Sequence, residues 1–225
     1  MKSILEKRII RFIDWGLDMN KYCLYYFPPH SGEFSDCLFV YFGGMNMTDR
    51  RESGKKVDKL FHKDILIGYI IKEFSYYCKI RVAGEVFLPN DEIIDLINDV
   101  LSEEGLDKID YINESGFYLG KIVDKQALKK SFLYRIDIGH ELYAESTFDL
   151  DKDDVIVLAV NETYLLPGRM IKEYEIAPGI KSGGRICSNL DLNIPPEDQL
   201  FPIVVEEKVE IGQDFFKVER RTLDA

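Results

Sequence analysis

Cysteine and histidine are scarce in this 225-residue chain, and their spacing argues against a dedicated metal centre. The three histidines share no helical or strand spacing, and no HExxH motif occurs. The four cysteines form no CxxC pair and no zinc-ribbon pattern. They are Cys23, Cys37, Cys78 and Cys187. We therefore expect reduced cysteines, no bound metal and no cofactor.

Long hydrophobic runs are also missing, and no stretch approaches the 18 or more apolar residues that span a bilayer. The N-terminal segment places Lys7, Arg8, Arg11 and Asp14 inside its apolar pattern, which leaves no uninterrupted core for a secretory signal. These features predict a soluble, cytoplasmic protein that contacts no membrane.

Positive charge is in deficit, because 29 Lys and Arg face 40 Asp and Glu, giving a net charge of −11. A general nucleic-acid binder needs clustered basic residues, so we expect no direct nucleic-acid contact. Residues 1–63 carry a balance of +3, which leaves −14 for the remainder. Acidic faces that only serve solubility are one interpretation. The other is an acidic C-terminal surface for a protein partner with a basic face.

Two segments of the N-terminal part predict helices from their periodicity. Residues 3–19 repeat apolar side chains at helical spacing. Residues 91–104 do so more clearly, with Asn90 as an N-cap and Gly105 as a stop. Residues 64–77 are apolar almost throughout, and their length favours a helix over a strand.

The remaining elements are expected to be strands. Segments 22–27 and 37–42 flank a turn-rich connection and predict an antiparallel pair, and segment 79–88 alternates like a strand. Beyond residue 106, short β-rich runs recur between glycine-containing turns, with one helical patch near 124–130. The expected runs are 109–112, 117–123, 132–138, 141–148, 155–160, 170–176 and 201–205.

The pattern as a whole predicts an α+β fold. A mixed α/β N-terminal domain is expected over residues 1–113. A β-rich C-terminal domain, a small barrel or sandwich with an extended tail, is expected over residues 114–225.

The FDLDKDD segment presents alternating carboxylates, which raises the question of a calcium loop. An EF-hand requires glycine at its sixth position and glutamate at its twelfth, and these positions hold Asp154 and Val160. We interpret the segment as an exposed turn. Its carboxylates are the candidate partner-binding residues: Asp149, Asp151, Asp153 and Asp154.

The stretch Gly139-His140-Glu141-Leu142-Tyr143-Ala144, followed by Leu166-Pro167-Gly168, resembles motifs of trimeric dUTPases and their dCTP-deaminase relatives. Glutamate stands where that family has aspartate, and no Arg-Ser phosphate motif follows, since Arg185 precedes Ile186. The resemblance implies a β-domain that binds or hydrolyses nucleotides. Its candidate ligands are Glu141, Arg169 and Arg185.

No catalytic constellation emerges from the sequence, so the catalytic residues stay unknown. The leading hypothesis is a non-enzymatic protein-interaction module, of the inhibitor, immunity, regulatory or assembly type, that uses its acidic C-terminal surface. Its 13 tyrosines and 14 phenylalanines supply interface anchors. A dUTPase-like nucleotide-binding domain is the enzymatic alternative, and a structural subunit of a larger assembly is the third.

Overall fold

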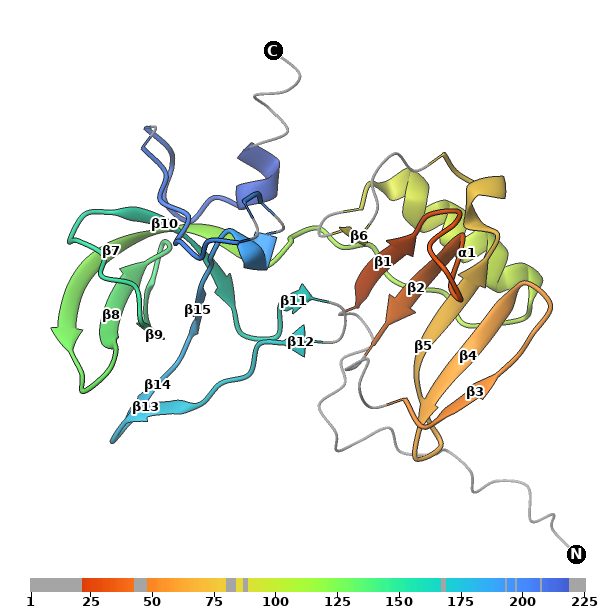
Figure 1. The fold of residues 1–225 in the computed structure, drawn as a ribbon, viewed down its shortest axis with the longest axis horizontal. Coiled ribbons are helices and arrows are strands. Elements are labelled where there is room, and N and C mark those ends of the chain that lie inside the picture. The colour runs from red at the N-terminus through yellow and green to blue at the C-terminus, as the bar shows by residue number, and fades with distance from the viewer. Residues whose placement is uncertain are drawn as a thin grey trace, which may run out of the picture.

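The computed structural model describes residues 22–42, 48–79, 84–86, 89–166, 169–192, 194–196, 198–206 and 208–218. It is mostly β, with 41% strand and 13% helix, and Figure 1 shows two main sheets joined by a single connecting segment. The helix expected over residues 3–19 lies outside the described residues.

The first sheet contains six antiparallel strands in the order β3-β4-β5-β2-β1-β6. Strands β1 and β2 pair as the sequence predicts, with Tyr25 opposite Phe39. Of the strand expected over residues 79–88, the structure describes the three residues of β6, Gly84–Val86. The bounds are β1 Cys23–Phe27, β2 Cys37–Tyr41, β3 Arg50–Glu52, β4 Val57–His62, β5 Ile65–Lys72 and β6 Gly84–Val86.

The helix predicted over residues 64–77 is wrong, because this segment forms strand β5 and a short 3-10 turn, Phe74–Tyr76. Strand β5 lies between β4 and β2 and buries both faces, which gives a nearly continuous apolar run. A bulge also interrupts its alternation: Leu66 pairs with Phe61 and Gly68 with Leu60, so Ile67 is an extra residue.

Helix α1, Asp91–Glu103, confirms the helix predicted over 91–104. The Asn90 side chain accepts a hydrogen bond from the Ile93 N–H at 3.0 Å, and Gly105 follows with φ +68°. Ile94, Ile97 and Leu101 are fully buried against one face of the first sheet. Among the described residues of this half, the fold is thus a sheet covered by one helix, and the expected α/β mixture is mainly β.

The second sheet has five strands in the order β15-β10-β7-β8-β9 and is nearly closed into a barrel. The Gly183 N–H donates to the Tyr143 carbonyl at 2.7 Å, which ties the approach to β15 to the opposite edge strand β9. The bounds are β7 Phe117–Ala127, β8 Phe132–Asp137, β9 Glu141–Ser146, β10 Val155–Val160 and β15 Gly184–Ile186. Of the two architectures expected for the C-terminal half, a small barrel or a sandwich, this sheet is closer to the barrel.

Two hairpins connect β10 to β15. The first pairs β11, Tyr164–Leu166, with β12, Arg169–Met170, and the second pairs β13, Glu175–Ala177, with β14, Ile180–Lys181. Tyr164 and Met170 pack on the face of the first sheet opposite α1, so the first hairpin bridges the two sheets.

Three smaller expectations differ from the structure. The helical patch near 124–130 is wrong, because β7 continues to Ala127 before a turn. Residues 109–112 form no strand, and 201–205 form isolated bridges at Pro202 and Val204 instead of one. Segment 170–176 holds only the end of β12 and the start of β13.

Candidate functional site

A hollow of about 200 Å³ lies beside the barrel, where β15 faces the segment between β12 and β13. We call it the basic hollow, because three of its lining side chains are cationic. Its polar lining consists of Glu145, Arg169, Lys172, Tyr174 and Arg185.

Strand β15 positions Arg185 at this hollow. Gly184 and Ile186 on either side are buried, so alternation directs Arg185 outward. A Cβ on Gly184 would lie 2.4 Å from the Ala159 carbonyl oxygen, and glycine therefore permits the close pairing of β15 with β10.

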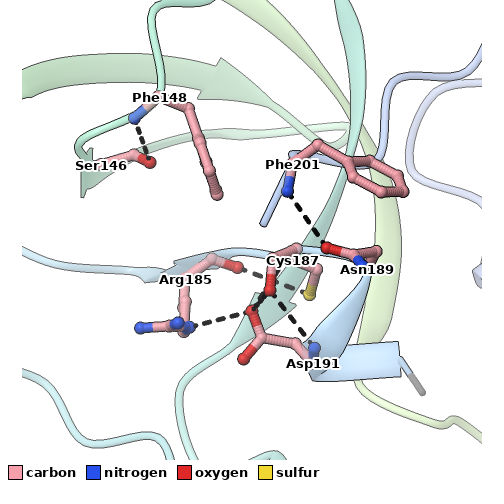
Figure 2. Close-up of polar contacts among 8 residues, drawn as sticks. Ser146, Phe148, Arg185, Cys187, Asn189, Asp191 and Phe201 are labelled. Atoms are coloured by element: carbon pink, nitrogen blue, oxygen red, sulfur yellow. Dashed lines mark hydrogen bonds and ion pairs between the residues drawn. The ribbon is translucent and has the colours of Figure 1, made fainter. Parts of the chain in front are cut away.

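A buried carboxylate fixes the Arg185 side chain. Asp191 is 5% exposed and lies within the short 3-10 helix Leu190–Leu192, and its Oδ2 accepts hydrogen bonds from Ser188 N and Oγ, both at 2.8 Å. Arg185 Nε approaches the same oxygen at 3.3 Å. Figure 2 shows this contact between the guanidinium group and the Asp191 carboxylate, and 42% of the Arg185 side chain is exposed. Arg185 is therefore held through its Nε while part of its side chain stays exposed.

Asn189 stabilises the loop behind this network. It is fully buried, and its Nδ2 donates to the carbonyls of Ile194, Pro196 and Gln199, while its Oδ1 accepts from Phe201 N at 3.1 Å. Figure 2 shows Asn189 beside Phe201 and adjacent to Cys187. Burial raises the pKa of the Cys187 thiol, so this cysteine stays protonated and serves as core.

The other two cations, Arg169 and Lys172, are exposed and form no ion pair with any described residue. Across the hollow, Glu145 accepts hydrogen bonds from Ser131 Oγ and, at 3.4 Å, from the Tyr174 hydroxyl. Burial and the Glu145 charge raise the pKa of Tyr174, which keeps that hydroxyl a donor. Three cations face two carboxylates, Glu145 and the Asp191 that pairs with Arg185, so this region keeps an excess of positive charge in a chain of −11.

The structure brings together two of the three residues proposed as nucleotide ligands, because Arg169 and Arg185 line the same hollow. Glu141 does not join them: it stands four residues from Glu145 along β9, about 13 Å at ~3.3 Å per residue, and pairs with Arg135 at 3.2 Å. Lys172 and Tyr174 were missed by the sequence reasoning. The one feature of the sequence that could have indicated Lys172 is its position close after Arg169 along an otherwise acidic part of the chain.

The four acidic candidates lie on the turn before β10, and most are engaged locally. Asp149 pairs with Lys125, and Asp153 pairs with Lys121 at 2.8 Å, which lowers the pKa of Asp153. The Asp154 carboxylate accepts from the Asp151 N–H at 2.8 Å. Three of the four carboxylates thus have partners inside the chain.

Neither a metal-binding cluster nor a membrane-spanning helix is found among the described residues. No group of three His, Cys, Asp or Glu side chains there is arranged to hold a metal ion. No helix in the same ranges is long and apolar enough to cross a membrane.

Comparison with models of known protein families and with curated proteins gave no match for this chain.

Proposed function

We propose that this chain is a non-enzymatic protein-interaction module whose binding surface is centred on the basic hollow. The observation that carries the proposal is the concentration of Arg169, Lys172 and Arg185 around one cavity of an acidic chain. Guanidinium groups bind carboxylates and phosphates through paired N–H donors, and Arg185 is held through its Nε with part of its side chain exposed.

The size of the hollow favours one group of a larger partner over a complete small molecule. Its volume of about 200 Å³ is below the ~300–1,000 Å³ of pockets that enclose drug-sized ligands. An acidic side chain of a partner fits this space.

Exposed tyrosines beside the hollow supply anchors for such a partner. Tyr174 is 47% and Tyr143 is 37% exposed, and Tyr143 shares the outward face of β9 with Glu145. Ser182 holds Tyr174 in place through two hydrogen bonds, at 2.8 and 3.1 Å. Tyrosine and arginine are enriched among the residues that contribute most to protein interfaces.

The acidic turn is the second surface of the proposed module, for a basic face of the partner. Asp151 is its most available carboxylate, since Asp149 and Asp153 already pair with lysines. Screening by salt affects both surfaces, so charge variants are needed to separate them.

The test is affinity purification from the source cells with quantitative mass spectrometry, comparing three charge variants with the wild type. Arg169→Glu/Lys172→Glu reverses the hollow, Asp151→Lys reverses the turn, and Lys55→Glu/Lys108→Glu is the control for the first. The control residues are exposed, lie in the N-terminal half, and give the same change in net charge.

We expect the wild type and the control to recover the same partner, and the hollow variant to recover at least fivefold less. Recovery by the wild type should also fall as salt is added. Equal recovery by the hollow variant would place the interaction elsewhere, and loss with Asp151→Lys alone would assign it to the acidic turn.

Nucleotide binding is the second candidate function, because Arg169 and Arg185 both line the hollow. The remote position of Glu141 weighs against a site built from all three residues. A thermal-shift panel of nucleoside triphosphates with Mg²⁺ distinguishes this candidate. Stabilisation by a nucleotide that disappears in Arg169→Ala would favour it over the protein-interaction function.

A further inference from the structure

A second hollow, of about 280 Å³, lies between the two sheets, and we call it the junction cleft. One wall comes from the start of β1, one from the connecting segment 111–118, and one from residues 160–164. Its aromatic and acidic lining includes Tyr22, Tyr111, Glu114, Tyr118, Glu162 and Tyr164.

Hydrogen bonds hold the walls of the cleft together before any ligand binds. Thr163 Oγ1 donates to the Gly116 carbonyl at 3.2 Å, which joins residues 160–164 to the connecting segment. Ser115 N and Oγ donate to the two oxygens of Asp214 at 2.6 and 2.8 Å, and Asp214 is itself 5% exposed. The cleft is therefore a formed site with three anchored segments.

Tyrosine rings form much of its surface. The Tyr22 hydroxyl donates to the Asp110 carbonyl at 2.6 Å, and Tyr118 donates to Glu114. The hydroxyl of Tyr111 donates to Asp95 on α1. These bonds fix the rings by their polar ends. Tyr22 and Tyr164 belong to the packed cores, at 5% and 6% exposed, so the accessible rings of the cleft are those of Tyr111 and Tyr118.

The charge of the lining is negative. Glu114 and Glu162 line the cleft, Asp214 lies behind Ser115, and no Lys, Arg or His is found among its described lining residues. Asn161, a neutral lining residue, is held by the hydrogen bond from its Nδ2 to the Ser182 carbonyl at 2.8 Å.

From this combination we infer that the junction cleft binds a small organic cation, an ammonium compound such as a quaternary or primary amine. Tyrosine faces attract cations through their ring quadrupoles, and the carboxylates supply the opposite charge. Two lining carboxylates among aromatic rings make a poor cage for a hard metal ion, which requires six or more oxygen ligands. This inference is independent of the basic hollow, with which the cleft shares no lining residue.

The test is isothermal titration of the full chain with choline, and with 3,3-dimethylbutan-1-ol as the neutral compound of the same shape. We expect choline to bind, and the neutral compound to bind at least tenfold more weakly. Putrescine serves as the primary-amine probe. Absence of binding by both choline and putrescine, or equal binding of the neutral compound, would overturn the inference.

Variants then place the binding in the cleft. Glu114→Gln should weaken choline at least fivefold, while Glu33→Gln, an exposed glutamate in the β1–β2 loop, should leave it unchanged. Tyr111 is 49% exposed, so its variants should fold. Tyr111→Ala should weaken binding and Tyr111→Phe, which keeps the ring, should retain it; identical affinities for these two variants and the wild type would count against the aromatic contact.

Discussion

Asp58 is a buried carboxylate that joins three strands of the first sheet, and its replacement gives the sharpest stability prediction. It is 1% exposed on β4, and its Oδ2 accepts from Arg51 Nε and Nη2 of β3 at 2.8 and 2.5 Å. Its Oδ1 accepts from Gly54 N at 3.0 Å and pairs with Lys72 Nζ of β5 at 3.0 Å.

These contacts determine how Asp58 titrates. Burial alone would raise the pKa of Asp58, but the hydrogen bonds from Lys72, Arg51 and Gly54 outweigh it and hold the pKa below its ordinary 3.8. A carboxyl with a lowered folded-state pKa stabilises the fold above its unfolded pKa. That contribution disappears as the pH falls through the folded-state pKa.

We predict that Asp58→Asn lowers the free energy of unfolding at neutral pH by about 2–3 kcal/mol. Removing one partner of a fully buried pair costs about 3–5 kcal/mol. The side chains of Arg51 and Lys72 are 39% and 31% exposed, so water compensates them in part and the cost falls below that range. As the pH falls below the ordinary 3.8 and through the lower folded-state pKa, the difference from the wild type should shrink, because the wild-type carboxyl protonates too.

The assay is urea unfolding followed by far-ultraviolet circular dichroism at neutral and acid pH. Asp64→Asn is the control, since its carboxylate is 93% exposed beside Arg50 and its loss should leave the midpoint unchanged. A wild-type midpoint for Asp58→Asn at neutral pH, or a deficit that is the same at both pH values, would refute the reasoning.

Two further replacements test the C-terminal half. Asp191→Ala removes the acceptor for Ser188 and Arg185 and should destabilise the barrel by about 2–3 kcal/mol; hydrogen exchange at Ser188 should accelerate, and unchanged protection would contradict this. Gly116→Ala should destabilise by more than ~1 kcal/mol, because φ is +82° and its Cβ would lie 2.1 Å from Thr163 Oγ1. Adding Thr163→Ala to Gly116→Ala should restore the part of the melting temperature that is lost to the steric contact. A wild-type melting temperature for Gly116→Ala alone would contradict the prediction.

The sequence predicted those elements whose signals are local. Helix α1 carries its own cap at Asn90 and its own apolar face, and the β1–β2 pair is marked by the turn-formers between the strands. The recurring short runs of the C-terminal half likewise indicated its β-rich sheet.

The errors arose where a distant contact decides the local structure. The bulge at Ile67 and the burial of both faces of β5 depend on β4 and β2. For this reason the segment 64–77 shows neither the two-residue alternation of a half-buried strand nor a clear helical repeat. Strand β7 extends past residue 123 because β8 pairs with it as far as Ala127 opposite Phe132.

The candidate site was predictable only in part, for a related reason. Arg169 and Arg185 are sixteen positions apart, and the two hairpins between β10 and β15 bring them to one hollow with Lys172. The acidic turn appeared as free charge in the sequence, yet Lys121 and Lys125 of β7 pair with two of its carboxylates. The sequence gives the number and position of the charged residues, but it does not show which of them form ion pairs in the fold.

The most direct measurement of the central claim is site-specific photo-cross-linking in the source cells. A photoreactive amino acid replaces Lys172 at the hollow, Asp151 at the acidic turn, or Lys108 in the N-terminal half, all of which are exposed. The account predicts a cross-linked partner from position 172 and none from position 108. A partner captured from position 151 but not from position 172 would contradict the claim that the basic hollow is the centre of the binding surface.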